Sequence, residues 1–273
     1  MTKARDLSVV PNQTLGMKNR LIDAGFIINQ RGYASGTPLS AGVYAHDRWK
    51  AGASGCTYTF TQGSLGVPIT ITITAGSLQQ IIEGCNMGEG GTYILSWTGT
   101  AQARINGGSY SASPLIVSGI TAGANTTIEF GTGTVLQPQL EKGSTATSFD
   151  YRPYGTELAL CQRYYQFVDS VSTGGSGSGF AMQRYADNTN TYANVLSFIQ
   201  TMRASPTITF ENGMRCHLPT LTVEAGTFSA MQISNQTAWI MVVPSSTNNS
   251  GIKSALIDGD GSSSKKILIN AEL

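Results

Sequence analysis

The stretch that decides the fold runs from Gln139 to Gln166 and reads QLEKGSTATSFDYRPYGTELALCQRYYQ. It ends a region of alternating, β-type sequence and then turns at residues 152–155, Arg-Pro-Tyr-Gly. Thr156 is suited to be an N-cap, because its side-chain oxygen can accept a hydrogen bond from an unpaired amide of the next turn. The residues that follow are good helix formers without glycine or proline. They predict one short helix from Glu157 to about Tyr164.

The predicted helix carries two apolar stripes. At helical spacing Leu158, Cys161 and Tyr165 lie on one face, and Leu160 and Tyr164 lie on another. A helix this short is marginal alone, so both faces need cover from a domain or from copies of the chain. The candidates for an oligomer interface are therefore Leu158, Cys161, Tyr164 and Tyr165.

The region before this stretch has the pattern of short strands joined by turns. Residues 69–74, Ile-Thr-Ile-Thr-Ile-Thr, place three isoleucines on one face of a strand. Asn106-Gly107 is the strongest hairpin signal. Many such strands at near-regular spacing predict a β-sandwich or a jelly roll. The predicted strands are 57–61, 69–74, 78–83, 92–97, 101–105, 114–117, 126–130 and 134–137.

The second half of the chain is also rich in β-type sequence, and the glycine- and serine-rich residues 174–179 predict a hairpin loop within it. The predicted fold is all-β, with an N-terminal jelly-roll sandwich, one short connecting helix and a C-terminal antiparallel β-sandwich domain. The predicted parts are an extended arm (1–18), the jelly roll (19–152), a turn with the linker helix (153–166) and the C-terminal β domain (167–273). Its predicted strands are 164–171, 179–183, 191–199, 207–210, 218–223, 229–234, 237–243, 251–258 and 265–270.

Composition limits the kinds of partner. Only 12% of the residues are charged and the net charge is +1, which provides no basic patch for nucleic acid or for a membrane surface. No run approaches the roughly 18 apolar residues of a membrane span, and the first residues lack the apolar core of a signal peptide. We therefore expect synthesis in the cytoplasm and no membrane insertion. The four cysteines are expected to be buried free thiols, with a disulfide as the alternative.

The string QLE-x-GS-x-AT-x-F-x-x-RP-x-x-x-EL-x-x-CQRYY, at 139–165, resembles a junction found in tail-fibre and minor structural proteins of tailed bacteriophages. In that family it follows a jelly roll that resembles a carbohydrate-binding module. Residues 3–7, 21–32, 44–49, 202–206 and 271–273 agree with the family, in its order. The resemblance implies a place on the virion tail, assembly in the host cytoplasm and a homotrimer. It also implies that the N-terminal arm binds other phage tail proteins.

Signals for catalysis are weak. The chain has no phosphate-binding loop, nucleophile elbow or zinc-protease motif. His46-Asp47 is the nearest arrangement to a base with an orienting acid. The other interpretation is a turn in which Asp47 caps backbone amides. By resemblance to sugar-binding jelly rolls, Asp23 or Glu141 could contribute oxygen ligands to a structural Ca²⁺; no other cofactor is expected.

What remains is binding chemistry, because sugar rings stack on aromatic side chains and their hydroxyls bond polar ones. Tyr93 and Trp97 share a face with Leu95 and are predicted core residues, whereas both core and ligand contact remain open for Trp49. Tyr110 follows a turn and is a better surface candidate. The predicted glycan-binding residues are Trp49, Tyr110, Tyr185, Asp187, Asn188, Asn190 and Tyr192.

The sequence and the resemblance together predict a non-enzymatic tail protein that contacts bacterial surface polysaccharide or glycoconjugate. The alternative is a structural adaptor or decoration protein that binds other virion proteins without recognising a glycan. A third hypothesis is an enzyme that degrades surface polysaccharide, which would need a pair of suitably spaced carboxylates.

Overall fold

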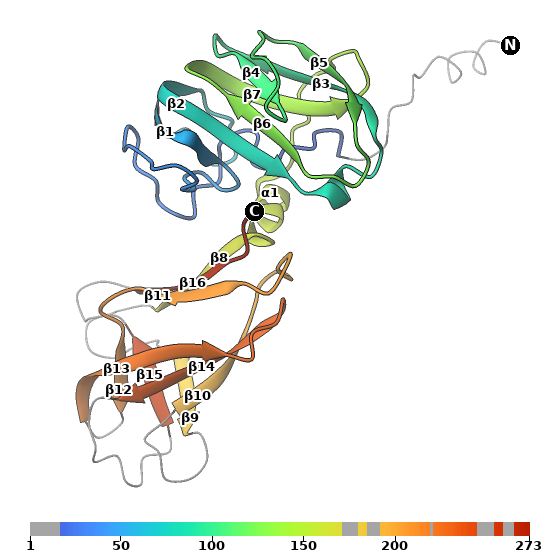
Figure 1. Ribbon diagram of the computed structural model, residues 1–273. Coiled ribbons are helices and arrows are strands. Elements are labelled where there is room, and N and C mark those ends of the chain that lie inside the picture. Colours follow the sequence, from blue (N-terminus) through green and yellow to red (C-terminus); the bar gives the residue numbers. More distant parts are fainter. Residues whose placement is uncertain (1–16, 171–179, 185–191, 219–220, 245–253, 259–264) are drawn as a thin grey trace, which may run out of the picture. The chain divides into compact units, whose positions relative to one another are not determined.

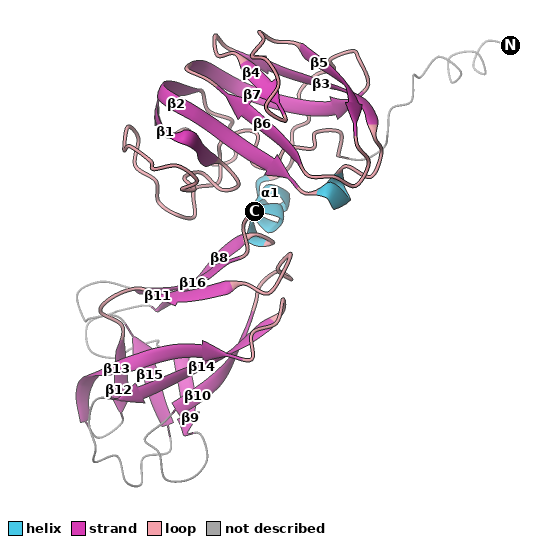
Figure 2. Ribbon diagram, in the orientation of Figure 1, coloured by secondary structure: helices cyan, strands magenta, loops and turns pink. Residues whose placement is uncertain are grey.

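The computed structural model describes residues 17–170, 180–184, 192–218, 221–244, 254–258 and 265–273 (Figure 1). The described residues are mostly strand, with one short α-helix (Figure 2). The chain divides into two compact units, one of residues 1–158 with Leu273 and one of residues 159–272. No helix in the described ranges is long and apolar enough to cross a membrane. Of the predicted N-terminal arm, residues 1–16 lie outside the described part.

The first unit contains one seven-stranded sheet in which every strand pair is antiparallel. The strand order is β4-β6-β2-β7-β3-β5, and β1 pairs with β2. β7 pairs with β2 through residues 133–135 and with β3 through residues 136–142, so it joins the two halves of the sheet. The strands are β1 (Lys50–Phe60), β2 (Ile71–Ile82), β3 (Gly91–Thr98), β4 (Ala103–Ile105), β5 (Leu115–Ile120), β6 (Thr126–Phe130) and β7 (Gly133–Lys142).

Alternation correctly predicts which side chains of this unit form its core. Ile69, Ile71 and Ile73 are all buried, while the threonines between them are exposed or half-buried. Tyr93 and Trp97 are also buried in this core, as predicted. The core of this unit is therefore built mainly from one face of these strands.

β2 is one strand where two were predicted, at 69–74 and 78–83. Gly76, at φ 68°, lies opposite a shift in the register between β1 and β2. A Cβ on Gly76 would come within 2.0 Å of the carbonyl oxygen of Gly55. Glycine here permits a bulge and a close approach of the two backbones, so the strand continues through a residue that sequence rules read as a break.

The hairpin predicted at Asn106-Gly107 is confirmed as a tight turn with one antiparallel bridge, between Ala103 and Ser111, whereas the strand partner of β4 is β6 and not the next strand, β5. Asn106 and Gly107 have positive φ angles, 49° and 73°, and the Gly108 amide donates to the Ile105 carbonyl at 3.0 Å. These angles suit the tight turns that join antiparallel strands. The turn follows β4 directly and leads the chain back to Tyr110.

The second unit differs from the predicted sandwich. Six strands close into a barrel in the order β10-β14-β13-β12-β15-β9, and three more form a sheet in the order β11-β16-β8. A closed barrel has no edge strands, whereas each sheet of a sandwich has two. The alternation of side chains along a single strand is the same in both, so the sequence pattern could not distinguish them. The strands are β8 (Tyr165–Ser170), β9 (Phe180–Arg184), β10 (Tyr192–Ser197), β11 (Thr207–Phe210), β12 (Arg215–Leu218), β13 (Leu221–Met231), β14 (Thr237–Pro244), β15 (Ser254–Asp258) and β16 (Lys265–Asn270).

The predicted hairpin around residues 174–179 is wrong in its pairing. β8 pairs with β16, and β9 pairs with β10 and β15, so the two strands that flank this segment are not hairpin partners. The segment itself lies outside the described residues. Sequence order suggested a hairpin, but the topology of the sheets separates the two strands.

The helix is α1, from Tyr154 to Gln162, rather than from Glu157 to Tyr164. Thr156 is therefore not the N-cap, because it lies inside the first turn. The Pro153 carbonyl accepts hydrogen bonds from the amides of Thr156 and Glu157, at 2.9 and 3.1 Å. Proline suits the residues at a helix start, since its fixed φ is helical and its missing amide proton would have no partner there.

The cysteine prediction holds in part. Cys56 and Cys161 are buried, whereas Cys85 is exposed in η2 (Gly84–Asn86), a single 3-10 turn. Burial raises the pKa of the Cys56 thiol to about 12, so this thiol is protonated and unreactive at neutral pH. The side chain of Cys216 lies outside the described residues.

Candidate functional site

Two of the predicted sugar contacts are core residues. Trp49 has an exposed fraction of 0%, its Nε1 donates to the Asp23 carbonyl at 2.9 Å, and its ring packs 4.9 Å from that of Phe26. Tyr192 is also at 0%, in the core of the second unit. Neither ring has a surface on which a sugar could stack, so both predictions are wrong. The other members of that group, Tyr185, Asp187, Asn188 and Asn190, lie outside the described residues.

Tyr110 is the predicted contact that does reach the surface, with 37% of its area exposed. Its hydroxyl donates to Glu129 Oε1 at 2.9 Å. The other oxygen of that carboxylate, Oε2, accepts from Nε of Arg104 at 2.9 Å and forms an ion pair with its Nη2 at 2.8 Å. The guanidinium carbon of Arg104 lies 4.7 Å from the centroid of the Tyr110 ring, within the range of a cation–π contact.

These side chains lie in one row across the sheet. Arg104 of β4 is directly opposite Glu129 of β6, which is directly opposite Gln79 of β2. Residues directly opposite each other in antiparallel strands point to the same face. The apolar neighbours of Arg104, Ala103 and Ile105, point to the core. The row therefore occupies the outer face, which we call the polar face: Arg104, Glu129, Gln79, Ser77 and Tyr110.

Glycine shapes this face at one point. A Cβ on Gly52 of β1 would meet Ser77 Oγ at 2.1 Å, and it would lie 3.4 Å from Glu129 Oε1. The missing side chain therefore makes room for the Ser77 hydroxyl beside the carboxylate. Any larger residue at position 52 would displace it.

The Glu129 carboxylate is ionised in this setting. Burial alone would raise its pKa, but hydrogen bonds from Ser77, Arg104 and Tyr110 outweigh that effect and lower the pKa below its ordinary value. The hydrogen bond to Glu129 also raises the pKa of the Arg104 guanidinium. The pair thus carries opposite charges that fix the two side chains relative to each other.

The polar face can bind but offers no obvious reacting group. The carboxylate of Glu129 is already bonded on both oxygens, so it acts as an anchor for its neighbours. Nη1 of Arg104 has no acceptor within the described residues, and 32% of that side chain is exposed. Gln102, two residues earlier on the same face, is exposed. A fixed guanidinium donor, an amide and a partly exposed phenol are groups that bond and pack against a polyhydroxylated ligand.

His46 is a buried core residue. Its Nδ1 lies 2.7 Å from the Tyr58 hydroxyl, and burial lowers the pKa of the imidazole to about 4. Asp47 accepts a hydrogen bond from the backbone amide of Gln30 at 2.7 Å. The interpretation of Asp47 as a cap for backbone amides is therefore confirmed for one amide. The imidazole has no exposed surface with which to meet a substrate.

The carboxylates of the two residues suggested for a Ca²⁺ site accept hydrogen bonds from different groups. Oδ1 of Asp23 accepts from the amides of Ile27 and Ile28 at 2.8 and 3.0 Å, and burial raises the pKa of its carboxyl well above the ordinary value. Both carboxylate oxygens of Glu141 bind Thr147. Within the described ranges no three His, Cys, Asp or Glu side chains are grouped so that they could hold a metal ion.

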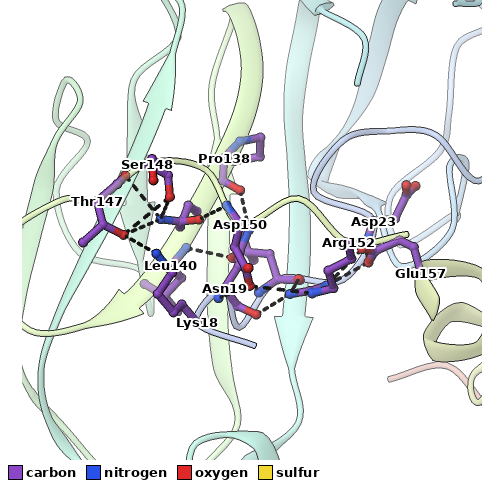
Figure 3. Close-up of polar contacts among 12 residues, drawn as sticks. Lys18, Asn19, Asp23, Pro138, Leu140, Thr147, Ser148, Asp150, Arg152 and Glu157 are labelled. Carbon is purple, nitrogen blue, oxygen red and sulfur yellow. Dashed lines mark hydrogen bonds and ion pairs between the residues drawn. The ribbon is translucent and has the colours of Figure 1, made fainter. Parts of the chain in front are cut away.

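A network of buried hydrogen bonds connects the residues before α1 to β7 and to the first turn of α1 (Figure 3). Asn19 Nδ2 donates to the Pro138 carbonyl at 3.0 Å, and Asn19 Oδ1 accepts from the amide of Leu140 at 3.0 Å. Arg152 Nη1 donates to both oxygens of Glu157, at 2.9 and 3.1 Å. Glu157 Oε1 in turn accepts from the Asp23 amide at 2.6 Å. These polar residues therefore hold the first turn of α1 in place.

The residues predicted for an oligomer interface are mostly covered within a single chain. Cys161 and Tyr164 have exposed fractions of 0%, Tyr165 of 6%, and Leu158 is half-buried. The argument that neighbouring subunits must cover these side chains is therefore wrong. A short helix does need cover, but the chain itself provides it.

Sequence analysis missed Arg104, Glu129 and Gln79. Each of the two charged residues is preceded and followed by a buried apolar residue, so alternation could have placed both on the outer face. Their pairing depends on the register between β4, β6 and β2, for which the sequence carries no direct signal. No family model, curated protein or solved structure matches this chain.

Proposed function

We propose that the chain is a non-enzymatic tail protein of a bacteriophage virion that contacts host surface glycans through the polar face. The observation that carries the proposal is the Arg104–Glu129–Tyr110 arrangement, in which a buried carboxylate fixes a partly exposed guanidinium and phenol. Fixed donors lose little freedom on binding, which favours recognition of flexible polyols. The tail assignment rests on the sequence resemblance described above.

The same resemblance leads us to assign the first unit to the jelly-roll class. Its antiparallel sheet, with β7 shared by the two halves, supports that assignment. The homotrimer rests on the resemblance alone, because the side chains that suggested it are buried in one chain. Several copies on one particle would add weak single-site affinities through effective concentration.

A glycan array tests this function. The full chain is biotinylated and displayed on streptavidin, so that weak sites act together, and it is compared with two variants. Tyr110→Ala removes the exposed ring of the polar face. Ile116→Ala, at a residue of β5 that is 50% exposed, is the control for loss of surface area. Retention of particular glycans by the wild type and the control, but not by Tyr110→Ala, supports the proposal. The absence of any retained glycan favours the adaptor function instead.

A further inference from the structure

We infer that the second unit binds a further copy of the same chain through the outer face of strands β10, β14 and β13. These strands are neighbours in the barrel, in that order (Figure 1). Their antiparallel registers place Val195 directly opposite Trp239, and Trp239 directly opposite Met231. Residues directly opposite each other point to the same face, so these three side chains form one row across the strands.

The row lies on the outside of the barrel. The residues on either side of Trp239 in β14, Ala238 and Ile240, have exposed fractions of 0% and belong to the core of the second unit. Because successive side chains of a strand alternate between its two faces, Trp239 points outward. Val195 and Met231 are 43% and 46% exposed, and Trp239 is half-buried. An apolar row that solvent can reach therefore crosses three strands.

The apolar character continues along β14, where Met241 is half-buried and Val243 is 45% exposed. We call the described residues of this outer face the apolar face: Ala193, Val195, Ser197, Thr227, Ser229, Met231, Thr237, Trp239, Met241 and Val243. None of these described side chains is charged. The outer face of the first unit differs, since it carries Arg104 and Glu129. A contiguous exposed apolar surface of this kind marks an interaction site.

A second copy of the apolar face is the partner that fits it best. Because the face is uncharged, two copies can bury it against each other without leaving a charge unpaired. Its centre is built from tryptophan and methionine, which are enriched in the centres of protein interfaces. Its rim is polar, with hydroxyls at Ser197 and Thr237 and with the exposed Gln183 of β9 opposite Ala193. An apolar centre inside a polar rim is the usual arrangement of a protein–protein interface.

The size of the apolar face sets the expected strength of association. Three strands about 4.8 Å apart, each followed over roughly seven residues, give a surface of about 300 Å². A standard interface buries about 800 Å² on each partner. We therefore expect weak association, with a dissociation constant on the order of tens of micromolar. Several copies held on one particle would reach such concentrations locally.

Sedimentation velocity of the full chain, from about 1 to 500 μM, tests the inference across this range. Val195→Glu and Met231→Glu each place a charge in the centre of the apolar face. Both positions are exposed in a single chain, so the new carboxylate can stay hydrated in the monomer but would be buried in the complex. Gln236→Glu is the matched control, because it adds the same charge at an exposed position in the turn between β13 and β14, outside the face.

Tryptophan fluorescence shows whether this face is the one that becomes covered. The chain has three tryptophans, and Trp49 and Trp97 have exposed fractions of only 0% and 7%. A change in emission with protein concentration therefore reports mainly on Trp239. Loss of water from around its ring should shift the emission to shorter wavelength.

The inference predicts that the wild type and Gln236→Glu associate with rising concentration, each with this shift in emission. Val195→Glu and Met231→Glu should associate at least about tenfold more weakly. A wild type that stays monomeric up to the highest concentration would overturn the inference, as would undiminished association of both face variants. An emission shift that a glycan causes in a monomeric chain would assign the face to a sugar and would also overturn it.

The inference rests on the proposed function only for the presence of several copies on one particle. The two can fail separately, because the glycan array displays every chain on streptavidin and so does not require self-association. Loss of glycan retention in Tyr110→Ala reports on the polar face of the first unit. Loss of association in Val195→Glu and Met231→Glu reports on the apolar face of the second.

Discussion

The guanidinium carbon of Arg104 lies 4.7 Å from the centre of the Tyr110 ring, and both side chains bind the Glu129 carboxylate. Arg104 is on β4, and Tyr110 follows the turn after that strand, so a short segment brings them together over β6. The carboxylate beneath them is 5% exposed. A carboxylate this well buried stays ionised only because its partners hydrogen-bond to it. The arrangement can therefore be tested by measuring how protein stability changes as Glu129 is protonated.

The first prediction concerns the acid stability of this group. The folded-state pKa of Glu129 is lowered from 4.5, so its contribution is present above that value and is lost as the pH falls through the folded-state pKa. Wild-type protein should therefore lose stability more steeply than Glu129→Gln below about pH 4.5. Urea unfolding, followed by the fluorescence of Trp49 and Trp97 in the first unit, measures this. Parallel pH profiles for the two proteins would contradict it.

Asp23 should behave in the opposite way. Burial, followed by the negative charge of Asp47, raises its folded-state pKa above 3.8. The stability that its protonated form provides is complete below the unfolded-state pKa and declines as the pH rises through the raised folded-state pKa. Asp23→Asn removes this titration and keeps an oxygen for the amides of Ile27 and Ile28. At pH 8 it should be at least as stable as the wild type.

Asp23→Ala is the matched comparison, because it leaves both amides without their acceptor. Its free energy of unfolding should fall by about 1–3 kcal/mol, the cost of unsatisfied buried groups. Denaturation of both variants at pH 5 and pH 8 checks the pair. An Asn variant that is less stable than the Ala variant at pH 8 would be inconsistent with a buried, protonation-sensitive carboxyl.

The Arg152–Glu157 pair is expected to stabilise the start of α1. Both side chains are more than nine-tenths buried, at 5% and 7% exposure. Arg152→Met would leave the Glu157 carboxylate buried without its cation, so the free energy of unfolding should fall by about 3–5 kcal/mol. Lys18→Met removes only an exposed hydrogen bond to Thr147, so the free energy of unfolding should change by at most about 0.5 kcal/mol. Equal effects in the two variants would show that the buried pair is not structural.

Gly76 and Gly119 form a natural pair for testing the bulge in β2. Both have a positive φ, 68° and 78°, but only Gly76 lies against another backbone. Gly119→Ala should cost about 1–2 kcal/mol through its conformation alone. Gly76→Ala must also displace the Gly55 carbonyl, so it should cost more than about 3 kcal/mol. Thermal unfolding measures both, and similar melting temperatures would argue against a tight approach of β1 and β2.

Periodicity predicts the local features of this chain well and its long-range features poorly. The isoleucines of 69–73 and the turn at Asn106-Gly107 follow from alternation and from the conformations that the turn requires, and both predictions are confirmed. The closure of the second unit into a barrel depends on pairings such as β9 with β15, which lie far apart in sequence. Two strands with similar patterns can be neighbours or not, so this closure could not be predicted.

The candidate site shows the same limit. An aromatic residue in a polar context can be predicted as a contact, as Tyr110 was. Its counterparts Trp49 and Tyr192 look similar in sequence but are buried, Trp49 directly before β1 and Tyr192 on the covered face of β10, and only the fold decides which positions are covered. The partners of Tyr110 could not be predicted, since Arg104 and Glu129 meet only through strand register.

The most direct test of the central claim is the binding of the streptavidin-displayed full chain to a glycan array, with Tyr110→Ala and Ile116→Ala beside it. The account predicts that the wild type and Ile116→Ala retain the same small set of glycans, and that Tyr110→Ala loses at least about tenfold of that signal. Undiminished retention by Tyr110→Ala would contradict a role for the polar face. No retained glycan for any of the three would contradict glycan binding itself.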